Sequence, residues 1–397
     1  MRLVHLADLH LGYRQYQRLT PGGVNQREAD VAATFRTAID RIIALQPDVV
    51  VVAGDIFHSA RPTNQAILHA LIELTRLREE LPNAIILLVA GGHDTPRASE
   101  MGGILRLFAQ LGFNVVDRRA ERVNFADHDL SILAVPDVPG LVRPALTPDS
   151  SAQFNVLVVH GMIEGVLPAS EAMADRASVA IPREDLELAR WDYVALGHYH
   201  VYREIAPNAY YSGSIDYTSV NTWGELYEQR VSSVRGGGKG FIERDLASGR
   251  HTFHPLPASR PLVDLPPISA TGLSAAELDA RLSAIVGNVP GGIDDKIVRA
   301  TIRDIPRHIG REMDHRPIRD FKRRALNFQL DLVRPDVRHA HGSGAPGRRP
   351  SLNEMVREKL LARPLDAEID RAALVDRAMK YLDEAQAIVP STALVEL

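Results

Sequence analysis

The sequence predicts an α/β protein in which two sheets pack as a sandwich flanked by helices, followed by a small α+β capping domain and C-terminal helices. Three observations support this fold class. Short β-branched runs alternate with segments of helical spacing to about residue 116, apolar strands then dominate to about 254, and prolines cluster between 255 and 267. Alternation followed by a strand-rich half is typical of layered sheets, and clustered prolines mark a joint between domains.

The first half supplies alternating strands and helices. Residues 48–53 are apolar and β-branched, as expected of a strand buried on both faces. Residues 30–45 carry apolar side chains at helical spacing, and Pro62 suits the first turn of the next helix. We therefore expect strands at 3–7, 48–53, 84–89 and 114–116, and helices at 30–45, 62–81 and 100–111.

The later elements follow from the same patterns. The strand-rich half is expected to hold strands at 130–135, 155–159, 193–196, 210–211, 240–245 and 251–254. Beyond the prolines, a small domain is expected to hold strands at 262–265, 296–305 and 327–333, and helices at 274–286 and 317–326. These patterns predict a large first domain at 1–258 and a small second domain, here called the capping domain, at 259–335.

The C-terminal part is expected to consist of a linker and two helices. Residues 336–350 are rich in glycine and proline and predict a flexible linker. Ser351 and Glu354 match a capping box at the start of a helix that ends near 363, and a second helix is expected at 366–387. Two short amphipathic helices bury little surface by themselves, so the region 351–397 is expected to need a docking surface.

Composition narrows the class of protein. The 397 residues include no cysteine, which excludes disulfides, thiolate metal sites and cysteine nucleophiles, and which fits a reducing cytoplasm. No apolar run approaches the roughly 18 residues of a membrane span, and the N-terminus does not resemble a signal peptide. The net charge of −4 means that any surface for nucleic acid must be local.

The chemistry is concentrated in five clusters of Asp, His and Gly that close predicted strands. They are Asp8-Leu9-His10, Gly54-Asp55, Gly91-Gly92-His93-Asp94, His160-Gly161 and Gly197-His198-Tyr199-His200. Taken alone, Asp55 is explained equally well as a turn or N-cap residue, and one histidine after a strand is more often structural. Oxygen and nitrogen ligands of this kind suit Mn, Fe or Zn, and two such ions can hold both reacting oxygens of a phosphodiester. The repetition predicts a two-metal phosphoesterase.

These motifs resemble the calcineurin-like metallophosphoesterase superfamily. Within it, residues 8–12, 54–58, 193–200 and 211–214 are similar to the SbcD branch, the bacterial form of the break-repair nuclease subunit. The resemblance covers the chain to about residue 255 and extends loosely to the later parts. It implies a DNA exonuclease on duplex ends and single-strand endonuclease, two divalent ions with manganese expected, and a cytoplasmic, nucleoid-associated protein. It also implies that 351–397 binds an SMC-like ATPase of the SbcC type, and it leaves a homodimer open.

The resemblance also assigns roles by position. Two ions would share the carboxylate of Asp55, His93 would assist the leaving oxygen, and Asp94 would orient His93. His58 is expected beside the ligands, although a surface or helix-start histidine explains it equally well. The expected ligands are Asp8, His10, Asp55 and His200 for one ion, and Asp55, His160 and His198 for the other.

One position departs from the family pattern. The family has Gly-Asn-His-Asp where this chain has Gly91-Gly92-His93-Asp94, and the asparagine supplies an amide oxygen to the second ion. Glycine has no side chain to donate, so we expect a weaker second ion and activity that is reduced or dependent on high metal. Substituting Gly92→Asn is expected to tighten that ion. A weakly active, DNA-end-binding scaffold subunit and a small-molecule phosphodiesterase are the alternative functions.

DNA contact has only local support. Residues 296–324 include ten basic and only four acidic residues, and Arg319, Lys322 and Arg323 are among the basic ones. A basic surface of this kind could follow a phosphate backbone. A solvated charged face is the alternative. The loop at 13–18 combines aromatic and basic residues, including Tyr13, Arg14 and Arg18, close to the first metal motif. These groups could stack on bases and touch phosphates. An ordinary surface loop is the alternative.

Overall fold

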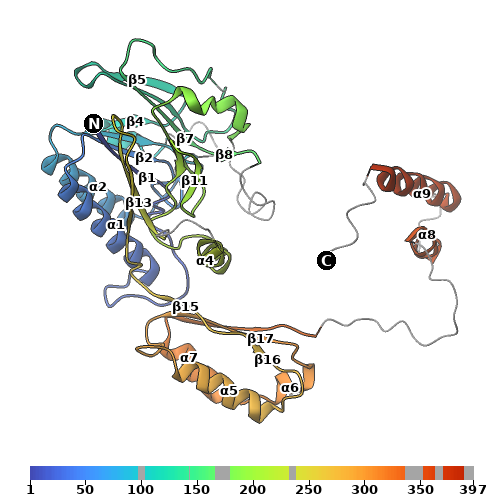
Figure 1. Cartoon of the computed structure of the whole chain (residues 1–397). Coiled ribbons are helices and arrows are strands. Elements are labelled where there is room, and N and C mark those ends of the chain that lie inside the picture. The colour runs from blue at the N-terminus through green and yellow to red at the C-terminus, as the bar shows by residue number, and fades with distance from the viewer. Residues whose placement is uncertain are drawn as a thin grey trace. The chain divides into compact units, whose positions relative to one another are not determined.

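The computed structural model describes residues 1–96, 103–142, 144–165, 179–231, 238–335, 352–362 and 370–388. The chain divides into two compact units, Met1–Pro335 and Asp336–Leu397. The first unit contains both the sandwich and the small domain after residue 259, and the second contains the two C-terminal helices (Figure 1).

Two six-stranded sheets confirm the predicted sandwich. The first sheet has the order β14-β13-β1-β2-β3-β4, in which β1 to β4 run parallel and β13 and β14 are antiparallel. Its strands are β1 Arg2–Leu6, β2 Val49–Ala53, β3 Ile85–Val89, β4 Asn114–Val116, β13 Gly240–Asp245 and β14 His251–Pro255. The parallel strands all end at the same edge of the sheet, which is the edge where open α/β sheets bind ligands.

The second sheet has the order β11-β12-β10-β7-β6-β5. Strands β6, β7, β10 and β12 run parallel to their neighbours in that series, and β5 and β11 are antiparallel edge strands. Its strands are β5 Glu121–Phe125, β6 Leu130–Val135, β7 Phe154–His160, β10 Tyr193–Gly197, β11 Arg203–Ala206 and β12 Ala209–Tyr211. A separate pair is formed by β8 Met162–Ile163 and β9 Ala180–Ile181.

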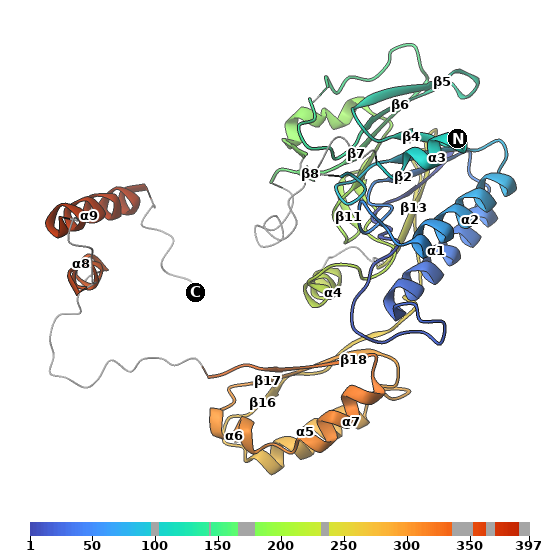
Figure 2. The ribbon, with the colours of Figure 1, turned by 180° about the vertical axis from the view of Figure 1, so that it is seen from behind.

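Strand alternation distributes side chains between two cores. In β2, Val49 and Val51 enter the core between the sheets, whereas Val50 and Val52 face the helices, as the two-residue period of a strand requires. The helices α1 Gln26–Leu45 and α2 Asn64–Glu80 lie side by side on the outer face of the first sheet (Figure 2). This arrangement holds the strand ends in a fixed frame.

Several elements differ from the sequence-based expectations. Helix α1 begins at Gln26 rather than 30, because the side chain of Asn25 accepts hydrogen bonds from the N–H groups of Arg27 and Glu28. Strands β5 and β11 and helix α4 Thr222–Val231 were not expected, since each is short and weakly patterned. Helix α3 spans Arg106–Gln110, and the expected start at 100 lies outside the described residues.

The small domain is a parallel sheet with helices on one face (Figures 1 and 2). Strand β17 pairs in parallel with β15, β16 and β18. A capping box between Ser274 and Glu277 starts the first helix, and Leu278 and Phe321 help to fill the core beneath the sheet. Its elements are β15 Leu262–Asp264, β16 Ile268–Ser269, α5 Ala275–Gly287, β17 Ile297–Arg303, α6 Arg307–Glu312, α7 His315–Arg324 and β18 Asn327–Leu332.

Charged side chains join this capping domain to the sandwich. Arg260 donates to both carboxylate oxygens of Asp30, at 2.7 and 2.9 Å, and to the carbonyl of Asp295 at 2.6 Å. Asp30 also accepts from Arg27, which is fully buried and pairs with Asp216. Buried, bidentate arginine contacts of this kind fix orientation as well as distance.

The second unit contains α8 Leu352–Ala362 and α9 Arg371–Ile388, which contact each other. Arg371 donates to the carbonyl of Leu361 at 2.6 Å, and the side chain of Asp370 accepts from the N–H of Ala372 at the start of α9. The linker and Ser351 of the expected capping box lie outside the described residues. Among the helices that the structure describes, none has the length and apolar character needed to cross a membrane.

Candidate metal centre

The predicted ligands meet because five parallel strands end at one place. Strands β1, β2 and β3 are neighbours in the first sheet, and β7 and β10 are neighbours in the second. Asp8 and His10 follow β1, Asp55 follows β2, His160 ends β7, and the turn at 198–200 follows β10. Side chains far apart in the sequence therefore lie at a common edge of the sandwich.

Two glycines allow the strand ends to come this close. Gly54 has a φ of +95°, and a Cβ at this position would overlap the imidazole ring of His160. A Cβ on Gly91 would overlap the carboxylate of Asp55. Only a residue without a side chain fits at either position, so these glycines are part of the site.

The backbone itself is unusual at the expected ligands. Asp8, His10, Asp55 and His198 all have positive φ, with values of 52°, 46°, 50° and 105°. Such conformations are costly for residues other than glycine and cluster at functional sites. The neighbouring strand end holds two of these residues in place, because the N–H of Asp8 donates to the carbonyl of Gly54 and the N–H of His10 donates to the carbonyl of Asp55.

One half of the site is a compact trio. The ligand atoms of Asp8, His10 and His200 all lie within 4.8 Å of one another. His10 Nε2 lies 2.9 Å from His200 Nε2 and 3.8 Å from Asp55 Oδ2. Burial and the neighbouring imidazole of His200 hold the pKa of His10 well below its usual value. His10 is therefore neutral, which is the form of imidazole that binds metal.

Asp55 lies between this trio and His160. Asp8, Asp55 and His160 form a second trio in which every residue is buried. The Nδ1 of His160 donates to the carbonyl of Ala53 at 2.8 Å, so its Nε2 is the atom that faces Asp55 Oδ2 at 3.3 Å. That buried Nε2 makes no hydrogen bond. An imidazole lone pair facing a carboxylate is favourable only with a proton or a cation between them.

The pKa values of the clustered carboxylates and imidazoles indicate that positive charge stabilises this site. Burial raises the pKa of Asp8 to about 7. Burial also opposes ionisation of Asp55, yet the imidazole of His160 holds the pKa of Asp55 well below its usual value, and Asp55 in turn raises the pKa of His160 to about 10 against the effect of burial. Buried carboxylates are stable only when paired or bound to metal. The donor set therefore fits divalent cations.

The other half of the site is less complete. The backbone N–H of His198 donates to both carboxylate oxygens of Asp8, at 3.0 and 3.1 Å, and its ring centre lies 5.7 Å from that of His160. Among the residues that the structure describes, His198 does not join any of the convergent trios. Gly92 contributes no side chain at this end. The second set of expected ligands is therefore looser than the first.

His93 and His58 lie against each other beside His10. The rings of His58 and His93 stack with centres 5.2 Å apart, and His93 Nδ1 lies 2.9 Å from the carbonyl oxygen of His58. Because a carbonyl only accepts, that bond requires the proton on Nδ1 of His93. His58 Nδ1 lies 3.3 Å from His10 Nδ1, so the structure places His58 beside an expected ligand.

The sequence places Asp94 directly after His93, and its contacts in the structure are with backbone N–H groups. Its buried carboxylate accepts hydrogen bonds from the backbone N–H groups of Ile56, Phe57 and Gly91, at 3.1, 2.8 and 3.0 Å. The ring of His93 is instead fixed by a backbone carbonyl. Asp94 therefore holds the loop after β2 against the turn that carries His93, and burial together with Asp55 raises its pKa to about 7.

Sequence reasoning missed Asp137, a carboxylate that is 2% exposed. It stands two residues beyond the end of β6, the same offset that places Asp8 beyond β1 and Asp55 beyond β2. This repeated offset is the signal that could have identified it. Asp137 lies beside Gly92, since a Cβ built on Gly92 would be 3.0 Å from Asp137 Oδ2.

Comparison with known proteins agrees with this geometry. The family model for calcineurin-like phosphoesterases matches residues 1–230, which is more than half of the chain. The chain belongs to the calcineurin-like phosphoesterase family. The matched segment contains every strand end that contributes an expected ligand.

Relatives of this calcineurin-like phosphoesterase include DNA double-strand break repair proteins Mre11. The protein of Methanococcus maripaludis is 30% identical over 264 residues, which are 62% of this chain and 63% of the relative. The protein of Methanosarcina mazei is 26% identical over 367 residues, which are 81% of this chain and 55% of the relative. The protein of Sulfolobus acidocaldarius is 30% identical over 208 residues, which are 51% of this chain and 50% of the relative. The matches span half to two thirds of each relative's length, and they confirm the expected resemblance to the break-repair branch.

Two of the residues that were expected to contact DNA make contacts within the protein instead. Tyr13 is 3% exposed and its ring packs edge-on against His58 with centres 5.0 Å apart, so it forms a wall of the site and is not available to stack on a base. Arg18 donates to Asp295 at 2.9 Å and to the carbonyl of Arg323 at 2.7 Å, which ties the loop to the capping domain. Arg14 remains exposed and lies 3.6 Å from Glu28.

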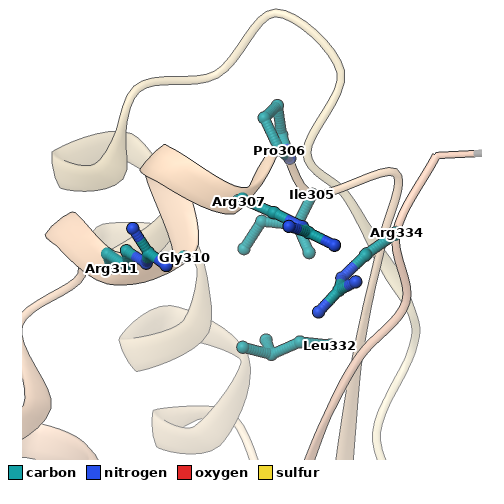
Figure 3. Close-up of a pocket in the computed structure, with 7 residues that line it drawn as sticks. All are labelled: Ile305, Pro306, Arg307, Gly310, Arg311, Leu332 and Arg334. Carbon is teal, nitrogen blue, oxygen red and sulfur yellow. The ribbon is translucent and has the colours of Figure 1, made fainter.

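The capping domain of this phosphoesterase presents basic side chains on its surface. Arg319, Lys322 and Arg323 are exposed on α7, and Arg323 pairs with Asp320. A pocket of about 360 Å³ lies beyond the ends of β17 and β18. Figure 3 shows the guanidinium groups of Arg307 and Arg334 turned toward each other above Leu332. Within the described part of the chain neither forms an ion pair, so both charges are available to an anion.

Proposed function

We propose that this chain is a metal-dependent DNA phosphodiesterase that processes DNA breaks, as an exonuclease on duplex ends and an endonuclease on single strands. The observation that carries the proposal is the convergence of two buried carboxylates and three imidazoles at the ends of parallel strands. Family membership supports phosphoester hydrolysis, and the similarity to double-strand break repair proteins supports DNA as the substrate. Such an activity would associate the protein with the nucleoid.

The proposed cofactors are two divalent cations, with manganese expected from the mixture of carboxylate and imidazole ligands. Cations bound there would lower the pKa of water and offset the charge that develops on the phosphoryl oxygens. The proposed ligands are Asp8, His10, Asp55 and His200 at one position, and Asp55, His160 and His198 at the other.

His93 is the proposed proton donor to the leaving oxygen. Its Nδ1 proton is engaged by the carbonyl of His58, so Nε2 is the atom that can exchange a proton with substrate. The N–H of His93 donates to Asp55 Oδ1 at 2.9 Å, which fixes the turn relative to the proposed bridging carboxylate. Asp94 contributes by holding that turn, and proton transfer of this kind typically contributes a factor of about 10² to 10⁴ in rate.

The capping domain is the proposed surface for the DNA backbone. Arg307 and Arg334 line one pocket, and Arg319 and Lys322 lie on the neighbouring helix α7. A small phosphodiester substrate would not need these charges. Replacing Arg307 and Arg334 by Gln should weaken DNA binding and lower the dependence of binding on salt, since each phosphate contact contributes about one unit to that slope.

The second unit is the proposed site for an SMC-like ATPase. Exposed apolar side chains on its two helices include Met355, Leu361 and Tyr381, with exposed fractions of 43%, 51% and 58%. Apolar side chains grouped on short helices are typical of helix-in-groove recognition. Deleting residues 351–397 should abolish copurification with an SbcC-type ATPase while hydrolysis of a small diester persists.

A direct assay separates this function from its alternatives. The full chain is incubated with Mn²⁺ and with single-stranded DNA, duplex DNA or bis-nitrophenyl phosphate, beside a His93→Gln variant. The proposal requires DNA cleavage that His93→Gln reduces. Efficient cleavage of the small diester with DNA intact would favour a small-molecule phosphodiesterase. DNA binding without cleavage in Mn²⁺, Co²⁺ and Mg²⁺ would favour the scaffold function that Gly92 suggests.

A further inference from the structure

Asp137 shares its placement with the proposed metal ligands. It follows β6 by two residues, and β6 pairs in parallel with β7, the strand that ends at His160. Asp8 and Asp55 stand at the same offset beyond β1 and β2. Asp137 is therefore at the same edge of the sandwich, on the side of the second proposed ion.

The side chain of Asp137 also fills the space that Gly92 leaves. A Cβ built on Gly92 would lie 3.0 Å from Asp137 Oδ2 and 3.7 Å from Asp137 Cγ. The amide oxygen of an asparagine lies two bonds beyond its Cβ. A carboxylate oxygen of Asp137, which comes from another strand, therefore lies within reach of the space that an asparagine side chain at position 92 would enter.

We infer that Asp137 supplies the oxygen ligand for the second ion that Gly92 cannot supply. This inference rests on the two-ion centre proposed above and changes one of its ligands from a neutral amide to a carboxylate. Carboxylate oxygen is a preferred ligand of manganese and similar divalent ions. The second position then gains a negative charge, which compensates only in part for the looser placement of His198.

The structure holds Asp137 firmly enough for this role. Its Oδ1 accepts the N–H of Val179 at 3.1 Å, and its own N–H donates to the carbonyl of Ala90 at 3.0 Å. Its carbonyl accepts the hydroxyl of Thr95 at 3.1 Å, and Thr95 belongs to the turn that follows Gly92 and His93. These contacts tie the carboxylate to both neighbouring strand ends, much as the chain itself would tie an asparagine side chain at position 92.

This placement changes the effect expected of Gly92→Asn. Because a Cβ at position 92 would press on Asp137 Oδ2, the asparagine and the carboxylate would compete for one space. The substitution should therefore give little gain in the otherwise unchanged chain. It should strengthen binding of the second ion only where the side chain at 137 has been shortened.

The test is a titration of the full chain with Mn²⁺, followed by calorimetry and by electron paramagnetic resonance of the bound ion. The informative variant is Asp137→Asn. Because one oxygen must still accept the N–H of Val179, its amide would turn an NH₂ group toward the second ion, and NH₂ cannot act as a ligand. We expect the first Mn²⁺ to bind as before and the Kd of the second to rise at least about 10-fold.

Two further variants keep the test independent of folding. Asp127→Asn makes the same change at an exposed carboxylate outside the site, so both affinities should stay close to those of the parent chain. Asp137→Ala combined with Gly92→Asn should recover the second ion that Asp137→Ala alone loses. Unchanged binding of both ions by Asp137→Asn would overturn the inference and leave the proposed function standing. Absence of Mn²⁺ binding by the parent chain would instead overturn the proposed function itself.

Discussion

The two halves of the candidate metal centre differ in how closely their expected ligands converge. Around one half, Asp8, His10 and His200 converge within 4.8 Å of one another. Around the other, the ring of His198 stands 5.7 Å from that of His160, and Gly92 contributes no side chain. The comparison indicates that the expected ligands converge more closely at the first position than at the second. Metal occupancy of the second position is therefore where this chain should differ from its relatives.

The largest effect is expected where the two halves meet. Asp55 contacts His160 and lies near His10, so Asp55→Asn should remove Mn²⁺ from both positions and lower phosphodiester hydrolysis at least about 100-fold. Calorimetry and cleavage of bis-nitrophenyl phosphate measure both effects. Asp127→Asn, a change at an exposed carboxylate, is the control. Retention of either ion by Asp55→Asn would show that this carboxylate is not shared.

Single substitutions on either side should separate the halves. His200→Gln should weaken the tighter Mn²⁺ ion, because His200 belongs to the compact trio. His198→Gln should affect only the weaker ion. Isothermal titration of both variants gives the two affinities directly. If both substitutions changed the same ion, the assignment of the two halves would be wrong.

A substitution of Asp94 tests whether the backbone contacts of this residue hold the turn of His93 and the loop of Asp55 in place. Asp94→Asn keeps an acceptor but loses the capacity to bond with all three N–H groups that now meet the carboxylate. One buried donor left without a partner costs about 1–3 kcal/mol of unfolding free energy. Hydrolysis should fall about 10- to 100-fold through misplacement of His93 and Asp55. Chemical denaturation and steady-state kinetics measure these effects, and unchanged stability would contradict the bracing role.

A pH dependence of stability is expected from β1, the strand that leads to Asp8 and His10. Burial lowers the pKa of His5 to about 3, and its Nδ1 lies 3.0 Å from the hydroxyl of Tyr193. The unfolded chain binds this proton near pH 6.5, so the unfolding free energy should fall as pH drops from 6.5 toward 3. The slope is about 1.4 kcal/mol per pH unit from this group. His5→Gln should flatten that part of the profile, and an unchanged slope would contradict the assignment.

Much of the fold could be predicted because its core strands are continuous apolar runs. Val49–Ala53 and Tyr193–Gly197 are buried at every position, so composition alone identifies them. Short edge strands such as β5 and β11 escaped prediction, since one exposed face leaves little apolar pattern. The start of α1 was misplaced because its cap, Asn25, lies before the apolar residues that marked the helix.

The site was predictable in its residue types and not in all its contacts. The placement of Asp8, His10, Asp55, His160 and His200 follows from strand ends that meet at one edge. The position of Asp137 beside Gly92 could not be deduced, because it depends on the distance between ends of two sheets. The burial of Tyr13 depends in the same way on how its loop folds back over His58.

The most direct test of this account is anomalous scattering from crystals of the full chain soaked in Mn²⁺. The account predicts two peaks that share the carboxylate of Asp55, one of full occupancy beside Asp8, His10 and His200 and a weaker one beside His160. An absence of peaks at Asp55, or a second peak as strong as the first, would contradict it.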